Sequence, residues 1–149
     1  MKLEEMTLDV EQSVDMKADI GDVFKKVLYR FGEGNVGPDG SSLNLTLEEW
    51  AGGRWFRDRG EGIQHLWGHV QVIKPPTLIE ISGPMFMSYP ALNHLEIKLE
   101  KISGGTSVTL RHRAIGMIAD DHREGIGEGW KHLLESLSED FAESAKATS

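Results

Sequence analysis

An amphipathic helix at the C-terminal end follows a succession of short strands, and this order constrains the fold most. Its apolar stripe comprises Ile126, Trp130, Leu133, Leu134, Leu137 and Phe141. Burying six such side chains contributes roughly 1.5–3 kcal/mol each before entropy is counted. The helix therefore needs an apolar sheet face to cover. The order predicts an α+β fold in which a curved antiparallel sheet of about six or seven strands wraps around the long C-terminal helix.

The first half of the chain supplies one strand, a short helix and the start of the remaining strands. Residues 6–16 alternate as a strand does, and Asp19 can N-cap a helix that Gly32 ends. Further strands are expected at 43–47 and 64–73. The inner positions expected in the first strand are Met6, Leu8, Val10 and Val14.

The clearest pair of strands forms a hairpin just before the final helix. Apolar residues alternate with polar ones over 95–99 and again over 108–110. If both apolar sets share one face, Ser103-Gly104 becomes a two-residue loop, which is a favoured hairpin connection. The same register places His112 beside Leu95 on the inner face.

The final helix begins with two features that need explanation. Asp120 or Asp121 is expected to be its N-cap, and helix capping explains His122 and these aspartates better than weak cation binding does. Three glycines then crowd the first two turns, and each costs about 1 kcal/mol relative to alanine. Either the helix approaches the sheet closely there, or the missing side chains leave room for a ligand. The three are Gly125, Gly127 and Gly129.

Composition excludes several classes of protein. The 149 residues include no cysteine, which excludes disulfides and thiolate chemistry. The net charge of −8 argues against binding to nucleic acid, and no apolar run is long enough for membrane insertion. The N-terminus lacks a secretory signal, so we expect a cytoplasmic protein. We expect a single domain over residues 1–149, with a core at 7–141 and a frayed tail at 142–149.

Histidine spacing gives no metal site. His65 and His69 lie four residues apart on one strand, roughly 13 Å at the rise of a strand, which is too far for one ion. Parity with Leu66 and Val70 places both histidines and Trp67 on the outer face, unless a bulge intervenes. We expect no metal and no cofactor.

Four motifs in a fixed order carry a resemblance to a known superfamily. They are Gly52-Gly53-Arg54-Trp55-Phe56, Gly68-His69-Val70 before Pro75-Pro76, the run from Gly105 to His112, and Gly129-Trp130 followed by Leu133 and Leu137. Over about residues 7–141 the chain resembles the SRPBCC superfamily, which has the START and Bet v 1-type helix-grip fold. It is most similar to the branch of activator-of-heat-shock-protein-90-ATPase homologues. The resemblance implies a hydrophobic cavity between sheet and helix. Members of the superfamily include lipid and hormone carriers as well as polyketide cyclases.

Two functions follow from such a cavity, and both remain open. The first is non-catalytic binding of a small hydrophobic molecule of lipid, polyketide or aromatic type. The second is a cyclase- or hydratase-type enzyme in which His112, Arg54 or Arg57 polarises a carbonyl. Residues 83–90 form either a flexible gate or an anchored loop. The predicted ligand-binding residues are Trp55, Met85, Phe86, Tyr89, Leu95, Leu110, His112, Ile126, Gly129, Trp130 and Leu133.

A third interpretation dispenses with the ligand. Side chains would then fill the cavity, and the protein would act through its surface. An exposed Trp67 would mark the partner or a homodimer contact in that case.

Overall fold

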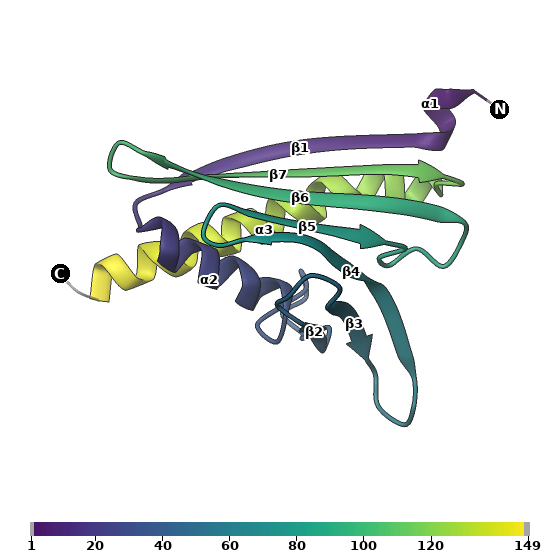
Figure 1. The fold of residues 1–149 in the computed structure, drawn as a ribbon, viewed down its shortest axis with the longest axis horizontal. Coiled ribbons are helices and arrows are strands. Elements are labelled where there is room, and N and C mark those ends of the chain that lie inside the picture. Colours follow the sequence, from purple (N-terminus) through teal and green to yellow (C-terminus); the bar gives the residue numbers. More distant parts are fainter. Residues whose placement is uncertain (1, 148–149) are drawn as a thin grey trace.

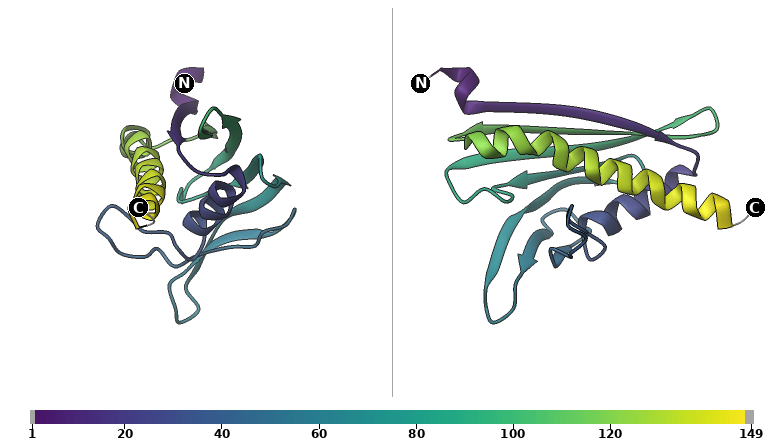
Figure 2. Two further views of the ribbon diagram at one scale, coloured as in Figure 1. Left: turned by 90° about the vertical axis from the view of Figure 1, so that its left-hand side faces the viewer. Right: turned by 180° about the vertical axis from the view of Figure 1, so that it is seen from behind.

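The computed structural model describes residues 2–147, with side chains described as far as residue 142. A seven-stranded antiparallel sheet forms one layer and the helices α2 and α3 lie against its concave face (Figures 1 and 2). The elements in chain order are α1 (Leu3–Met6), β1 (Thr7–Met16), α2 (Ile20–Phe31), β2 (Leu45–Leu47), β3 (Arg54–Asp58), β4 (Gln64–Lys74), β5 (Leu78–Gly83), β6 (Ala91–Ile102), β7 (Gly105–Gly116) and α3 (Asp120–Ala147).

The sheet has the order β1-β7-β6-β5-β4-β3-β2, so the chain enters at one edge and crosses to the other. The long helix α3 runs along the sheet and contacts β1 and α2 (Figure 2). An ion pair between Arg30 of α2 and Asp140 of α3, at 2.6 Å, joins the two helices. The predicted α+β helix-grip architecture is confirmed.

The predicted hairpin is confirmed in its register. Leu95 of β6 pairs with His112 of β7, and Ile102 pairs with Gly105 across the two-residue loop. Leu95 and His112 are both fully buried. The alternation of apolar and polar residues therefore fixed which face of these strands packs against the helices.

The short helix α2 also follows the predicted pattern. The Asp19 carboxylate accepts a hydrogen bond from the Gly21 amide at 3.0 Å, as an N-cap does, and the helix ends at Gly32. Strand β1 begins at Thr7, whereas Met6 belongs to α1, so the prediction of Met6 as an inner strand position was wrong. Four residues of local helix, closed by a hydrogen bond from the Thr7 hydroxyl to Leu3 O, displaced it.

Strand β4 contains the main error of the parity argument. Trp55 of β3 pairs with Gly68 while Phe56 pairs with Leu66, which leaves Trp67 as the extra residue of a β-bulge. The bulge turns Trp67 into the core, where it is 7% exposed, and leaves Leu66 42% exposed. The outward Trp67 was therefore a wrong prediction. His69 is exposed as expected, and His65 is half-buried.

The start of α3 differs from expectation. The helix begins at Asp120, so Asp120 and Asp121 lie in its first turn and neither is the N-cap. Their negative charges interact favourably with the helix dipole there. The helix continues to Ala147, and the frayed tail at 142–149 stays a prediction. Residues 148–149 lie outside the described part. Within residues 2–147, no helix has the length and apolar content needed to cross a bilayer.

Candidate functional site

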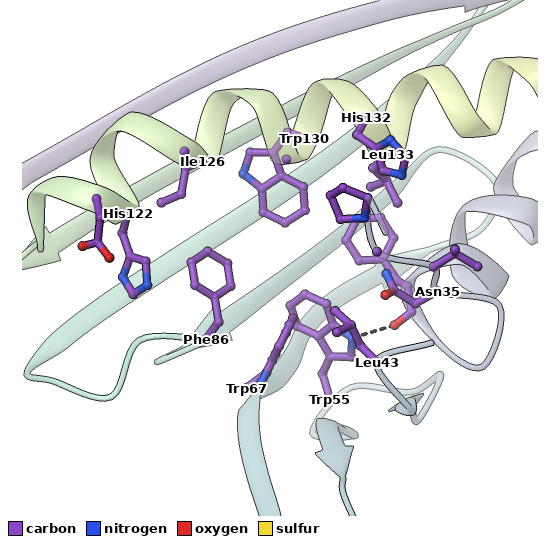
Figure 3. A pocket seen from close by; sticks show the side chains of 17 residues that line it. Asn35, Leu43, Trp55, Trp67, Phe86, His122, Ile126, Trp130, His132 and Leu133 are labelled. Atoms are coloured by element: carbon purple, nitrogen blue, oxygen red, sulfur yellow. Dashed lines mark hydrogen bonds between the residues drawn. The ribbon is translucent and has the colours of Figure 1, made fainter. Parts of the chain in front are cut away.

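A cavity of about 300 Å³ opens between α3, the loop that joins α2 to β2, and strands β3 and β4 (Figure 3). Its size is at the small end of the usual range for ligand pockets, and its wall is predominantly apolar. Side chains therefore do not fill the space between sheet and helix. The lining residues are Phe31, Asn35, Val36, Gly37, Pro38, Leu43, Trp55, Trp67, Phe86, Asp121, His122, Gly125, Ile126, Gly129, Trp130, His132 and Leu133.

Five aromatic rings of Phe and Trp line the cavity. Trp55 packs edge-on against Trp67, with ring centroids 5.1 Å apart, and Trp67 in turn packs against Phe86 at 5.7 Å. On the other side, the rings of Phe31 and Trp130 stack at 6.1 Å. The Trp55 indole is locked in place because its Nε1–H donates to Phe31 O at 2.6 Å. Five rings in fixed contacts form a preorganised apolar wall, suited to a flat molecule.

The surroundings of the α3 glycines test the account of close approach to the sheet. A Cβ atom built on Gly125 or Gly129 would meet nothing within 4 Å, and both residues line the cavity. Close approach to the sheet therefore does not explain these two glycines. Gly127 differs, because its carbonyl accepts a hydrogen bond from Gln12 at 2.7 Å and its Cβ would lie 3.8 Å from the same amide. Gly125 and Gly129 are exposed to solvent and border the cavity.

His112 is a buried residue with both ring nitrogens occupied. Trp130 Nε1–H donates to His112 Nδ1 at 3.0 Å, so the proton of the neutral ring lies on Nε2. His112 Nε2–H donates in turn to Asn93 Oδ1 at 2.6 Å. Asn93 is also fully buried, and its amide donates to the carbonyls of Gly83 and Pro84. The network fixes the Trp130 indole at the cavity wall.

Burial also sets the charge of His112. Desolvation disfavours the imidazolium and lowers the pKa of His112 to about 4, from the ordinary value of 6.5. The ring is therefore neutral at physiological pH. A neutral ring with an acceptor at Nδ1 is the form that the hydrogen bond from Trp130 requires.

A second histidine lies at the cavity itself. His122 Nδ1 is 2.6 Å from Tyr89 Oη, and its ring packs edge-on against Phe86 with centroids 5.4 Å apart. Tyr89 Oη also accepts a hydrogen bond from the Ala119 amide at 3.3 Å. These contacts join the first turn of α3 to the loop between β5 and β6.

Two buried polar atoms of the cavity residues have no hydrogen-bond partner among the described residues. They are Asn35 Oδ1 and Trp67 Nε1. The other end of the Asn35 amide is used, because Nδ2 donates to Arg30 O at 3.1 Å. Buried polar atoms are nearly always paired, so these two mark positions where a ligand or water is expected.

The predicted ligand-binding residues divide into two groups. Those that line the cavity are Trp55, Phe86, Ile126, Gly129, Trp130 and Leu133. Those that lie outside its lining are Met85, Tyr89, Leu95, Leu110 and His112, of which Tyr89 and His112 hydrogen-bond to lining residues. In the 83–90 segment, Met85 and Met87 are buried anchors, and the Met85 amide donates to Trp67 O at 2.7 Å.

Neither arginine proposed for catalysis lines the cavity. Arg54 is paired with Glu48, whose oxygens lie 2.9 and 3.0 Å from the guanidinium, and its cation lies over the Phe56 ring. That ion pair lowers the pKa of Glu48 to about 2. Arg57 donates to Leu43 O at 3.1 Å and so ties β3 to the loop beside the cavity. Both side chains have structural partners.

Sequence reasoning missed several cavity residues. The loop residues 35–38 carry no periodic pattern, Leu43 was assigned to the buried face of a strand predicted at 43–47, and His122 was explained by helix capping. Trp67 was assigned to the wrong face because the bulge leaves no mark in the apolar alternation. Among the described residues, no group of three His, Asp or Glu side chains could hold a metal ion.

Known proteins share both the sequence pattern and the fold. A family model described as "Activator of Hsp90 ATPase homolog 1-like protein" matches residues 39–142. A crystal structure from Chromobacterium violaceum has a TM-score of 0.69 at 15% identity, covering 89% of this chain and 96% of its own. One from Nitrosomonas europaea has a TM-score of 0.66 at 18% identity, covering 94% and 97%. No curated protein sequence matches significantly.

A third similar structure comes from a biosynthetic protein. The di-domain ARO/CYC StfQ of the steffimycin pathway has a TM-score of 0.67 at 13% identity, with 97% of this chain covering 53% of that one. At these identities the structures establish the fold alone. The family model covers well over half of the chain. The chain belongs to the family of Activator of Hsp90 ATPase homolog 1-like proteins.

Proposed function

We propose that the protein binds a small, flat, hydrophobic molecule of aromatic or polyketide type in the cavity beneath α3. One observation carries this proposal: Gly125 and Gly129 lie in a helix, contact nothing that would exclude a side chain, and border the cavity. Glycine at such positions costs helix stability. Space for a ligand explains why these positions lack a side chain.

The chemistry of the wall supports the same class of ligand. Trp55, Trp67 and Trp130 present ring surfaces in fixed orientations, and their contacts are already made without a ligand. Preorganised aromatic walls bind flat rings with little loss of side-chain entropy. The family's helix-grip fold is a ligand-binding fold, and the similar structure StfQ is an ARO/CYC from a biosynthetic pathway.

The test is a binding titration with a flat aromatic probe, 2-acetylnaphthalene, followed by quenching of tryptophan fluorescence. Gly129→Leu places a side chain at the cavity, and we expect it to reduce affinity at least tenfold. Glu128→Leu is the matched control, because this neighbour is exposed and does not line the cavity. Equal affinity in Gly129→Leu, Glu128→Leu and wild type would refute binding in this cavity.

A cyclase- or hydratase-type enzyme is the second candidate, favoured by His122 at the cavity wall. Its Nε2 has no partner among the described residues, so it could exchange a proton with a bound carbonyl compound. Deuterium incorporation next to the carbonyl of bound 2-acetylnaphthalene in D₂O would support enolisation assisted by an N–H donor at the carbonyl. Saturable binding without exchange above the rate of free 2-acetylnaphthalene favours the carrier.

A further inference from the structure

The contact between His122 and Tyr89 is the basis on which we assign the donor nitrogen of His122. Tyr89 Oη accepts the Ala119 amide proton, and we assign its own proton to the contact with His122 Nδ1, 2.6 Å away. Nδ1 is then the acceptor of the neutral ring, and the proton lies on Nε2. No described residue accepts this second proton. His122 thus presents an unpaired N–H donor at one end of the cavity.

Asn35 presents the opposite chemistry at the other end. Its Nδ2 donates to Arg30 O, which fixes the orientation of the amide and leaves Oδ1 without a donor. A buried acceptor without a partner is unfavourable, so a donor from a ligand would be stabilising. In Figure 3, His122 and Asn35 lie at opposite ends of the cavity, with the rings of Phe86 and Trp130 between them.

Negative charge at the His122 end of the cavity limits which ligand group can accept the hydrogen bond from His122. Asp121 lines the cavity next to His122 in the first turn of α3. A carboxylate there repels an anionic group, whereas a neutral carbonyl oxygen is accepted without that cost. The chain's net charge of −8 acts in the same direction.

We infer that the cavity recognises a neutral flat aromatic ketone with a hydroxyl group at its far end. The ketone oxygen accepts from His122 Nε2–H, the hydroxyl donates to Asn35 Oδ1, and the rings lie against Phe86 and Trp130. Tyr89 acts as a positioning residue, because it holds the His122 ring and its tautomer. This inference rests on the proposed binding function and names the ligand class for the same cavity.

The test compares three naphthalene probes that differ in one polar group each, measured at pH 7 by tryptophan quenching. The probe 6-acetyl-2-naphthol carries both groups, 2-acetylnaphthalene lacks the hydroxyl, and 2-naphthol lacks the ketone. We expect 6-acetyl-2-naphthol to bind roughly three- to tenfold tighter than either of the others, which is the usual effect of one hydrogen bond.

Variants show which residue provides the gain in affinity from the ketone and which provides the gain from the hydroxyl. His122→Phe should remove the advantage of the ketone and retain that of the hydroxyl, whereas Asn35→Ala should do the reverse. Tyr89→Phe keeps the aromatic ring at position 89 and the imidazole of His122. It should reduce only the gain in affinity that the ketone provides. In each comparison the affinities of different probes are measured on the same variant. A general loss of stability caused by Asn35→Ala would weaken all probes alike, so it cannot produce the expected difference between them.

Three outcomes separate this inference from the proposed function. Equal binding of all three probes, abolished by Gly129→Leu, would overturn the polar recognition and leave the binding function standing. Equal weakening of every probe by His122→Phe and Asn35→Ala would likewise overturn it. Binding of no probe would overturn both.

Discussion

Protonation of His112 should destabilise the fold as the pH falls, by an amount that follows from its burial. The pKa of this ring is about 4 in the folded chain and 6.5 when it is exposed. The unfolded chain therefore binds a proton first as acid is added, and between these two values the folded state loses stability. The contribution is complete above pH 6.5, falls through the window, and levels off below about pH 4.

The difference between the two pKa values sets the size of the effect. It corresponds to about 3 kcal/mol of unfolding free energy, with a slope of about 1.4 kcal/mol per pH unit inside the window. Such a loss is a large part of the stability of a typical domain. The imidazolium would also have to donate from Nδ1, where Trp130 Nε1–H already points, so the hydrogen bond that fixes Trp130 is broken as well.

Urea unfolding at a series of pH values measures this contribution directly. Other groups titrate over the same range, so the comparison is with His112→Gln, which keeps an N–H donor for Asn93 and has no proton to gain. We expect the wild type to lose about 3 kcal/mol more than His112→Gln between pH 7 and pH 4. Parallel curves for the two proteins would refute the reasoning that the neutral buried ring supports the fold.

Three further sets of substitutions should change the stability of the fold through their local surroundings. Gly125→Ala and Gly129→Ala should each raise the unfolding free energy by about 1 kcal/mol, because the added Cβ atom contacts no other residue. Thermal unfolding measures this change. A loss of stability would contradict the open space at these positions. Trp130→Phe removes the donor to His112 Nδ1 and leaves that acceptor buried, so we expect a loss of about 1–3 kcal/mol in urea, and an unchanged midpoint would argue against the network. Asp19→Ala removes the N-cap of α2 and should cost about 1 kcal/mol, with Asp19→Asn as the control that retains the cap.

The strands that could be predicted correctly are those with uninterrupted alternation. In β6 and β7 apolar residues alternate with polar ones over 95–99 and 108–110, and a two-residue loop closes the pair, so a single register buries both apolar sets on one face. Strand β4 has two irregularities, one at Trp67 and one between Val70 and Val72. Each shifts the side chains that follow by one position, and a parity argument has no means to detect the shift.

The site was predictable in its apolar wall and less so in its polar ends. Trp55, Trp130 and Leu133 are apolar residues on elements whose inner face the periodicity identifies. Asn35 and the Tyr89–His122 pair depend on loops and on tertiary contacts between residues far apart in the chain. The cytoplasmic location, the single domain and a homodimer remain predictions.

The glycines of α3 connect the stability of the chain with its proposed function. Gly125 and Gly129 together cost the helix about 2 kcal/mol relative to alanine, and no packing contact at those positions offsets this. A ligand that binds only the folded chain stabilises it by about 2.7 kcal/mol when present at a hundred times its dissociation constant. Ligand binding is therefore of the right size to offset the loss. Alanine at the two positions should produce a protein that is more stable when empty and gains less from added ligand.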